Sequence, residues 1–315
     1  MERTAILTQL LEMGAAVALA PLFLGWVTQC RAWLQNRSAP PVWLPYRAIR
    51  KLFHKDAVLA QDASPLFRIA PYVVFGTMVV AAAIIPSMST LPLNRAADAI
   101  ALVGLFATAR VFMSLAAMDV GTAFGTFGAR REMMVGFLAE PALLMVIFVA
   151  SLISQSTALP VISEALATQA LGLYPSLAFT AVAFTLVLLA ENARIPVDNP
   201  ATHLELTMIH EAMLLEYSAR HLALMEWAAA LKLFNYACIG FALFLPWGLA
   251  TGAAGPQALA LAIPALLAKL AVAGLGIAVI ETLSAKLRVF RVPEFLAAAF
   301  LFAVLGMLVH QLLGA

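Results

Sequence analysis

Long apolar runs separated by short polar connections are the dominant pattern along this chain of 315 residues. About 20 apolar residues is the length that an α-helix needs to cross the hydrocarbon core of a bilayer. The pattern predicts an all-α, polytopic membrane protein with eight transmembrane helices, folded as one integral membrane domain over residues 1–315. The eight runs lie near residues 5–28, 69–90, 98–117, 134–154, 174–191, 227–249, 257–282 and 293–313.

The composition agrees with a membrane protein and argues against an independent enzyme. Hydrophobic residues make up 63% of the chain and charged residues 11%, with a mean hydropathy of +0.94, whereas soluble domains contain about 25% charged residues. Cys30 and Cys238 are too few for an iron–sulfur cluster or a zinc site. The sequence also lacks nucleophile elbows, phosphate loops and dinucleotide fingerprints. We expect a conduit or coupling element that is not catalytic alone and binds no cofactor or metal itself.

Basic residues are concentrated in alternate connections. The expected cytoplasmic loops hold fourteen lysines and arginines, whereas the outer connections hold only Arg3 and Arg95. Because basic residues favour cytoplasmic loops, we predict a multi-pass protein of the cell (inner) membrane with both termini outside. The cytoplasmic loops are predicted at about residues 29–68, 118–133, 191–226 and 283–292.

The first of these loops contains an amphipathic segment. Three prolines break the chain before residues 46–59, in which Ile49, Leu52 and Phe53 fall on one helical stripe. The basic residues of the segment fall mostly away from that stripe. This pattern predicts a short amphipathic cytoplasmic helix at the membrane interface.

The fifth loop, residues 191–226, carries six carboxylates, three histidines and only two arginines. Ionisable side chains beside a bilayer are costly unless they pair or line a hydrated cavity. We interpret the loop as a funnel whose carboxylates raise one another's affinity for protons and relay them. The alternative is a solvated loop helix paired with basic residues of another subunit. The carboxylates assigned to this path are Glu191, Asp198, Glu205, Glu211 and Glu216.

Prolines divide this loop. Pro196 and Pro200 interrupt any helix that continues from the fifth span, and Asn199 can cap a new helix over about 201–224. Such a helix would place its histidines and a tyrosine on one face: His203, His210, Tyr217 and His221. Their spacing does not match a zinc-protease motif, so no metal is expected.

Several charges fall inside the predicted spans. Charges at this depth normally face the bundle interior, where they pair or contact water. Glu12 and Arg110 lie closer to the expected interfaces and could reach them by snorkelling. Four others are candidates for a buried polar path that continues from the funnel, with static pairing of Glu140 to an arginine as the alternative: Glu140, Lys232, Lys269 and Glu281.

The third loop, residues 118–133, combines glycines with two consecutive arginines. Because glycine permits close backbone approach, we expect this loop to dock a soluble subunit. The basic residues assigned to partner docking are Arg37, Arg47, Lys51, Arg130, Arg131 and Arg194.

Residues 191–198, with the sequence ENARIPVD, resemble the inner-loop signature of the membrane-anchor subunit of respiratory complex I, subunit 1 of NADH dehydrogenase. The chain is still more similar to the corresponding subunit of formate hydrogenlyase and other group 4 nickel–iron hydrogenases, through residues 198–207 and 210–218. Further matching blocks, in the same order, are Pro45–Arg47 with Lys51–Leu52, Asp119–Thr122 with Phe124–Gly125, Arg131–Met133 and Ala139–Pro141.

The resemblance implies a subunit without redox centres that docks a peripheral arm and couples its electron transfer to proton or sodium movement. It implies that Glu140, Glu191 and the loop carboxylates lie in the ion path. The implied partners are hydrogenase-like large and small subunits, an iron–sulfur protein, antiporter-like membrane subunits and membrane lipid, and not nucleic acid. The nickel–iron centre and the iron–sulfur clusters are then expected in those partner subunits.

Two departures from the complex I branch favour a hydrogenase-type complex. Thr202 and His203 stand where that branch has further acids, and Ala39 stands where it prefers glycine. The alternative within the class is the quinone-site subunit of a complex I-like NADH dehydrogenase. From other classes, a stand-alone cation or proton transporter would show internal repeats, and a purely structural scaffold would not need its buried carboxylates.

Overall fold

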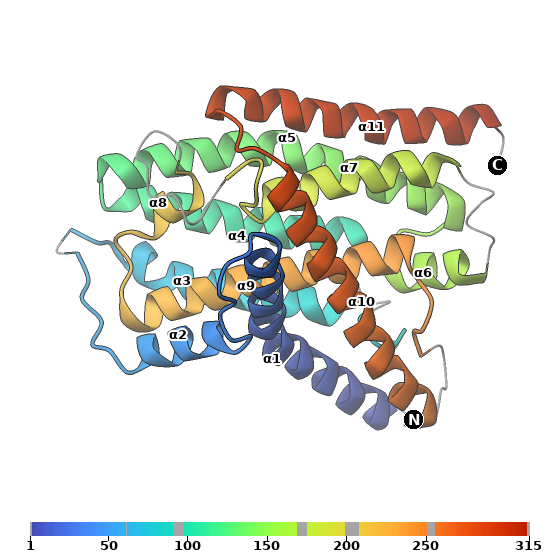
Figure 1. Ribbon diagram of the computed structural model, residues 1–315, viewed down its shortest axis with the longest axis horizontal. Coiled ribbons are helices and arrows are strands. Elements are labelled where there is room, and N and C mark those ends of the chain that lie inside the picture. The colour runs from blue at the N-terminus through green and yellow to red at the C-terminus, as the bar shows by residue number, and fades with distance from the viewer. Residues whose placement is uncertain are drawn as a thin grey trace.

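The computed structural model describes residues 2–60, 62–90, 98–168, 175–198, 208–250 and 256–313, which are mostly helical (Figure 1). A β-bridge between Ser89 and Ala250 pairs two extended segments, and these ranges contain no longer strand. The predicted all-α class is therefore confirmed. The helices are α1 (Glu2–Leu34), α2 (Leu44–Phe53), α3 (Pro65–Ile84), α4 (Ala99–Asp119), α5 (Ala123–Ser154), α6 (Leu159–Thr168), α7 (Pro175–Glu191), α8 (His210–Leu214), α9 (Ala219–Phe244), α10 (Pro256–Leu283), the 3₁₀-helix η3 (Val289–Arg291) and α11 (Val292–Leu313).

Within the described ranges, seven helices are long and apolar enough to cross a membrane. They are α1, α3, α4, α5, α9, α10 and η3 continued by α11. The helix α7 is also apolar but has only 17 residues, and α6 has 10. The polytopic membrane fold is thus confirmed. Seven helices meet the length criterion for a span where eight are predicted, because α7, which corresponds to the predicted fifth span, is too short to be counted.

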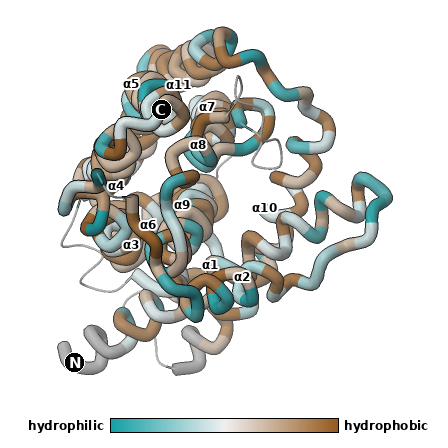
Figure 2. Tube along the Cα trace, turned by 90° about the vertical axis from the view of Figure 1, so that its left-hand side faces the viewer, coloured by the Kyte–Doolittle hydropathy of each residue, from teal (hydrophilic) through white to brown (hydrophobic). Residues whose placement is uncertain are grey.

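The helices pack in two groups that meet at α4 and α5. One group is α5, α7 and α11, and the other is α3 with α4 and α9. The helix α1 packs against α9 and also against α10. In Figure 2, α10 stands apart from α7 and α11, so it is attached to the bundle mainly through α1.

One end of the bundle collects the polar connections. The helices α1, α7 and α10 end there, and α3, α5 and α9 begin there, beside α2 and α8 (Figure 1). We call this the loop end, and the other end the far end. Figure 2, seen from this side, shows many hydrophilic positions in the connections.

The helix α2 corresponds to the predicted amphipathic segment. Prolines before it and at its second residue start the helix, because their fixed φ suits a first turn. Ile49 is buried, whereas Arg47, Arg50 and Lys51 are exposed. The Tyr46 hydroxyl donates to the main-chain oxygen of Ala18 in α1. The helix therefore packs on the bundle through one face and presents its cations outward.

The expected loop over 118–133 is mostly helical, which corrects the prediction. Only Val120–Thr122 separates α4 from α5. The Thr122 hydroxyl accepts from the backbone N–H of Gly125 at 3.4 Å and so caps α5. A Cβ placed on Gly128 would lie 2.9 Å from the Ala212 Cβ. This glycine therefore serves close packing of α5 against α8 within the chain.

The helix expected over 201–224 is also not continuous. Residues 199–207, which include His203 and Glu205, lie outside the described residues. Beyond them, α8 has five residues and α9 begins at Ala219, earlier than predicted. The predicted shared face of the histidines and Tyr217 is therefore wrong.

Contacts of the connection between α8 and α9 explain this break. Ser218 exchanges two hydrogen bonds with Val58, of 3.0 and 2.6 Å. The Tyr217 ring stacks on Phe67 with centroids 4.1 Å apart, and its hydroxyl donates to the Phe67 carbonyl at 3.1 Å. Burial raises the pKa of the Tyr217 phenol, so the hydroxyl stays protonated and remains a donor. These bonds hold the connection against the start of α3 and redirect the chain into α9.

Candidate functional site

A buried arginine in α4 collects carboxylates from two other helices. Arg110 is 5% exposed, and its guanidinium pairs with Glu140 of α5 and Glu191 of α7. Its Nε lies 3.6 Å from the Glu132 carboxylate, also in α5. Residues distant in sequence thus converge on one guanidinium, which ties α4, α5 and α7 together.

Glu191 is the most strongly held member of this group, which we call the Arg110 cluster and define as Arg110, Glu132, Glu140, Glu191 and Lys232. The Lys232 ammonium in α9 lies 2.9 Å from the Glu191 carboxylate. Because Glu191 is the last residue of α7, its carboxylate is positioned where the helix ends and the fifth loop begins.

The spacing of residues in α5 explains how Arg110 can be accommodated. Glu132, Gly136 and Glu140 recur every fourth residue and so share one helical face. A Cβ on Gly136 would collide with the Arg110 guanidinium. The glycine therefore leaves the space that the arginine occupies between its two glutamates.

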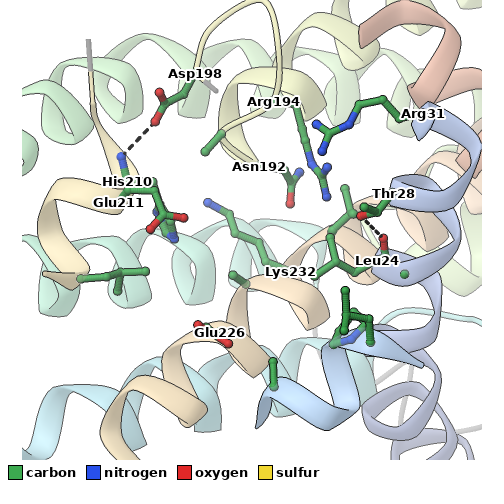
Figure 3. A pocket seen from close by; sticks show the side chains of 18 of the residues that line it. Leu24, Thr28, Arg31, Asn192, Arg194, Asp198, His210, Glu211, Glu226 and Lys232 are labelled. Carbon is green, nitrogen blue, oxygen red and sulfur yellow. Dashed lines mark hydrogen bonds between the residues drawn. The ribbon is translucent and has the colours of Figure 1, made fainter. Parts of the chain in front are cut away.

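A second buried acid lies where α10 ends. Glu281 pairs with Arg194 at 3.2 Å and with Arg31 at 3.4 Å. Arg194 comes from the loop after α7 and Arg31 from the last turn of α1. The side chains of Arg31 and Arg194 approach each other in Figure 3. One carboxylate thus joins the fifth loop to α1 and α10.

Asp198 forms the third polar centre. Its Oδ2 accepts from the backbone N–H groups of Ile209 and His210, at 3.2 and 3.1 Å, and its Oδ1 lies 3.3 Å from the Lys286 ammonium (Figure 3). The carboxylate satisfies donors at the start of α8 that no preceding turn can satisfy. It also links the fifth loop to the connection before α11.

These centres border one cavity of about 380 Å³. Its charged walls include Arg31, Glu191, Arg194, Asp198 and Lys232, and its apolar walls come from α1, α2 and α9. The volume lies within the range of about 300–1,000 Å³ that is usual for ligand pockets. The other lining residues are Leu24, Gly25, Thr28, Pro40, Pro41, Leu44, Pro45, Ala48, Asn192, Ala193, His210, Glu211, Leu214, Glu226, Ala229 and Leu233.

The Arg110 cluster contains three carboxylates and two cations. Like charges that share a poorly solvated site raise one another's affinity for a proton. A third carboxylate without its own cation is therefore a place where one proton can be held and released. Glu140 is the most accessible of the three, with a side chain 32% exposed.

Most of the predicted path residues lie near this cavity. Glu191, Asp198, Glu211 and Lys232 line it, Glu281 binds two of its arginines, and Glu140 belongs to the Arg110 cluster. Glu216 is half-buried between α8 and α9 and is not a lining residue. Glu205 lies outside the described residues.

Lys269 lies apart from the other predicted path residues. Its ammonium donates to the main-chain oxygens of Leu245, at 2.7 Å, and Trp247. It also lies 5.9 Å from the centre of the Phe241 ring. Lys269 therefore satisfies carbonyls just after the C-terminal end of α9, at the far end of the bundle.

The predicted docking residues divide into exposed and engaged side chains. Arg37, Arg47, Lys51 and Arg130 are exposed near the loop end. Arg131 donates to the Met208 carbonyl at 2.7 Å. Arg194 is buried in its pair with Glu281. Only the first four are thus displayed on the surface.

Sequence reasoning missed Arg110 and Glu132 as members of the site. Arg110 was expected near an interface, yet it lies near the middle of α4 and is buried. That central position, and the Glu–Gly–Glu repeat of α5, were the available signals. Among the described residues, no group of three or more metal-ligating side chains could hold a metal ion.

Comparison with known proteins places this geometry in context. The family model for NADH dehydrogenase matches residues 7–311. Formate hydrogenlyase subunit 4 of Escherichia coli K12 is 34% identical over 303 residues, covering 96% of this chain and 97% of the relative. Hydrogenase-4 component C of the same organism is 37% identical over 235 residues, covering 73% and 72%.

A solved structure has the same fold. A chain of the membrane-bound sulfane sulfur reductase, an archaeal respiratory membrane complex, superposes with a TM-score of 0.82. The match covers 96% of this chain and 98% of that one at 19% identity. At this identity the likeness supports the fold alone.

Proposed function

The chain belongs to the NADH dehydrogenase family, and from this premise we propose that it anchors and couples a hydrogenase-type complex. It docks a peripheral redox arm on the membrane and links electron transfer to proton or sodium translocation, as part of a complex like formate hydrogenlyase or hydrogenase-4. The predicted family resemblance is confirmed by the matching model and by relatives aligned over most of the chain. The chain contributes to an oxidoreductase without catalysing the reaction itself.

One observation carries the coupling role. Arg110 is buried among three carboxylates, and one of them, Glu191, also lines the cavity. Buried ionisable residues in a membrane bundle are typical of ion and proton pathways. A redox arm docked at the loop end would alter the field at Glu191 and so change how tightly the cluster holds a proton.

The membrane arrangement follows from counting α7 as an eighth span. Seventeen residues extend about 26 Å, slightly less than the hydrocarbon thickness. Eight spans place both termini on the same side, and the positive-inside rule places them outside the cytoplasm of the cell inner membrane. The loop end then faces the cytoplasm, where a peripheral arm would dock.

The exposed arginines and the lysine at this end are the proposed docking contacts. Arg37, Arg47, Lys51 and Arg130 are available to acidic side chains of a partner. The partners we propose are hydrogenase-like large and small subunits and an iron–sulfur protein, with antiporter-like subunits beside the bundle in the lipid. The nickel–iron and iron–sulfur centres then reside in the soluble partners.

A quinone-site subunit is the second candidate, favoured by the shape of the cavity. Its walls combine largely apolar surface with several charged side chains, as suits a small amphipathic ligand. A stand-alone transporter is less favoured, because binding sites of that class typically use discontinuous helices at the midplane. The long helices of the described bundle run through their spans without breaks.

Substitution within the cluster tests the coupling role. In sealed membrane vesicles that contain the intact complex, Glu140→Gln and Glu191→Gln should lower ion translocation at least about tenfold. The exposed Asp56→Asn is the matched control and should behave as wild type. If both glutamine variants assemble and translocate ions as the wild type does, the coupling role is wrong and the chain is a purely structural scaffold of the complex.

A further inference from the structure

Another buried acid, which belongs neither to the Arg110 cluster nor to the lining of the cavity, lies in the first helix. Glu12 in α1 is 6% exposed within a membrane span. It does not snorkel, which corrects that expectation. Its carboxylate accepts from the Ser89 hydroxyl, and no cation of the described chain pairs with it.

An extended segment closes over this carboxyl at the far end. After α3, the chain pairs with the residues that follow α9: the Thr90 N–H donates to the Ala250 carbonyl at 3.1 Å, and the Ala250 N–H donates to Met88 at 2.8 Å. Ser87, Ser89 and Thr90 are all buried. The Thr90 hydroxyl oxygen is buried without a hydrogen-bond partner among the described residues, which is where an ordered water is commonly found.

The helices packed against α1 do not supply a countercharge. None of their titratable groups forms a bond or ion pair with Glu12, and Lys269 on α10 is bonded to the Leu245 and Trp247 carbonyls. An unpaired carboxylate is strongly disfavoured in such a site, whereas a neutral acid is not. The groups concerned are Arg68 and Tyr72 on α3, Arg220, His221, Glu226, Lys232, Tyr236 and Cys238 on α9, Lys269 and Glu281 on α10, and Tyr46, Arg47, Arg50 and Lys51 on α2.

Glu12 and Arg31 mark the two ends of one face of α1. Ala16, Ala20, Phe23 and Val27 lie between them at helical spacing and are buried. The face packs on α9, where the Phe23 and Phe234 rings meet edge to face at 6.5 Å. Nineteen residues correspond to about 28 Å along a helix, close to the roughly 30 Å of the hydrocarbon core. Glu12 therefore lies about one membrane thickness from Arg31, whereas the cavity extends along α1 as far as Leu24.

Two polar side chains lie along the contact of α1, α3 and α9, and Asn235 is the one between these two levels. Asn235, three residues after Lys232 on α9, donates to the Met78 carbonyl of α3 at 2.9 Å. Gln9, which lies on α1 about one turn beyond Glu12 towards the N-terminus, donates to the Ala83 carbonyl of α3 at 3.0 Å. The step from Met78 to Ala83 is about 7.5 Å. Polar groups thus continue from the Arg110 cluster towards Glu12 along the contact of α1, α3 and α9.

We propose that Glu12 is a second proton-binding residue, which exchanges a proton with water at the far end of the bundle. In the forward step the carboxylic O–H breaks, the proton passes to water at that surface, and the carboxylate is reprotonated through the polar groups around Asn235. The proposal rests on the proposed function, because it adds a second proton-binding residue at the far end of the bundle, opposite the end at which the redox arm docks. A purely structural Glu12 would only tether the 85–90 segment to α1.

The substitution Glu12→Gln in the intact complex separates these roles, because an amide keeps the shape and a hydrogen bond to Ser89 but cannot release a proton. In sealed vesicles we expect ion translocation to fall at least about tenfold. The control Ser89→Ala removes the tether and keeps the acid, so it should retain most of the activity. Wild-type translocation in Glu12→Gln would overturn the proposal. Glu140→Gln and Glu191→Gln are measured in parallel. If these two variants also translocate ions as the wild type does, the proposed function itself is wrong; if only Glu12→Gln does, the role of Glu12 alone is wrong.

A spectroscopic measurement covers the case in which Glu12→Gln does not assemble. A neutral carboxylic acid has a C=O stretching band whose frequency rises when it loses a hydrogen bond. We expect the infrared difference spectrum of the complex between acidic and alkaline buffers to contain such a band, shifted upward in Ser89→Ala. An unshifted spectrum in Ser89→Ala would overturn the assignment to Glu12.

Discussion

The guanidinium of Arg110 and the carboxylate of Glu191 form a buried ion pair between residues 81 positions apart, at the point where α7 ends. Lys232 holds the same carboxylate from α9. A buried pair of this kind adds little stability compared with apolar packing, but leaving one partner alone is costly. The pair therefore fixes how α4, α7 and α9 meet and makes the charge state of the cluster sensitive to any change at the loop end.

Removing the cation should expose this dependence. Arg110→Met leaves Glu132, Glu140 and Glu191 without their common partner, so the free energy of unfolding should fall by about 3–5 kcal/mol. The measurement is the thermal unfolding of the purified complex in detergent. Arg50→Met, at an exposed position of α2, is the control and should change stability by about 0.5 kcal/mol or less. Equal behaviour of the two variants would contradict a central role for Arg110.

A single methyl group in α5 provides a second test. Gly136→Ala places a Cβ against the Arg110 guanidinium, so it should destabilise the protein by about 1–3 kcal/mol. Gly76→Ala in α3 meets nothing within 4 Å and should stabilise the helix by about 0.5–1 kcal/mol. Thermal unfolding of both variants measures the difference. A gain in both would mean that the space beside Gly136 is not needed.

The general architecture could be predicted because it depends on local patterns. Apolar runs predict the long helices, and the stripe around Ile49 predicts α2. The loop over 118–133 was predicted wrongly because Thr122 caps a helix that the glycines do not interrupt. Local capping outweighed the usual preference of glycine for connections.

The site could be predicted only in part because sequence position does not determine which helices meet. Glu140 and Lys232 are predicted as charges inside the spans and Glu191 as a carboxylate of the loop, whereas Arg110, the partner that Glu140 and Glu191 share, is predicted near an interface. Lys269 was grouped with them, although α10 carries it to the carbonyls that follow α9. Packing between helices distant in sequence decides these pairings, and a single sequence does not record it.

Asp198 combines two roles that substitution can separate. Asp198→Asn keeps an oxygen for the Ile209 and His210 N–H groups and loses the attraction to Lys286, whereas Asp198→Ala loses both. We expect alanine to destabilise by about 1–3 kcal/mol and asparagine by less. The thermal midpoint of the complex gives the comparison, with the exposed Asp56→Asn as control. If asparagine and alanine have the same effect, the cap contributes nothing.

Tyr217 should make stability depend on alkaline pH. Burial raises the folded-state pKa of its phenol above the ordinary value of 10.0, so the unfolded chain loses this proton first as the pH rises. Tyr217→Phe should cost about 1 kcal/mol below pH 10, where the bond to Phe67 is intact. The wild-type advantage should shrink from about pH 10 upwards, because the unfolded form then ionises first. Unfolding at several pH values measures this, with Tyr72→Phe, at a half-exposed position, as control; a constant difference would contradict it.

The surplus of one carboxylate in the Arg110 cluster predicts opposite outcomes for two similar substitutions. Glu140→Gln leaves two carboxylates and two cations, so the complex should assemble with nearly unchanged stability while ion translocation falls. Glu191→Gln removes the acid that both Arg110 and Lys232 contact, so it should destabilise the bundle by about 3–5 kcal/mol in addition to uncoupling it. Thermal unfolding and translocation measured on the same preparations separate the two effects. If Glu140→Gln were the more destabilising variant, the shared proton would reside on Glu191 and not on Glu140. The reason is that a neutral carboxylic acid can be replaced by an amide at little cost, whereas replacing a carboxylate breaks a buried ion pair.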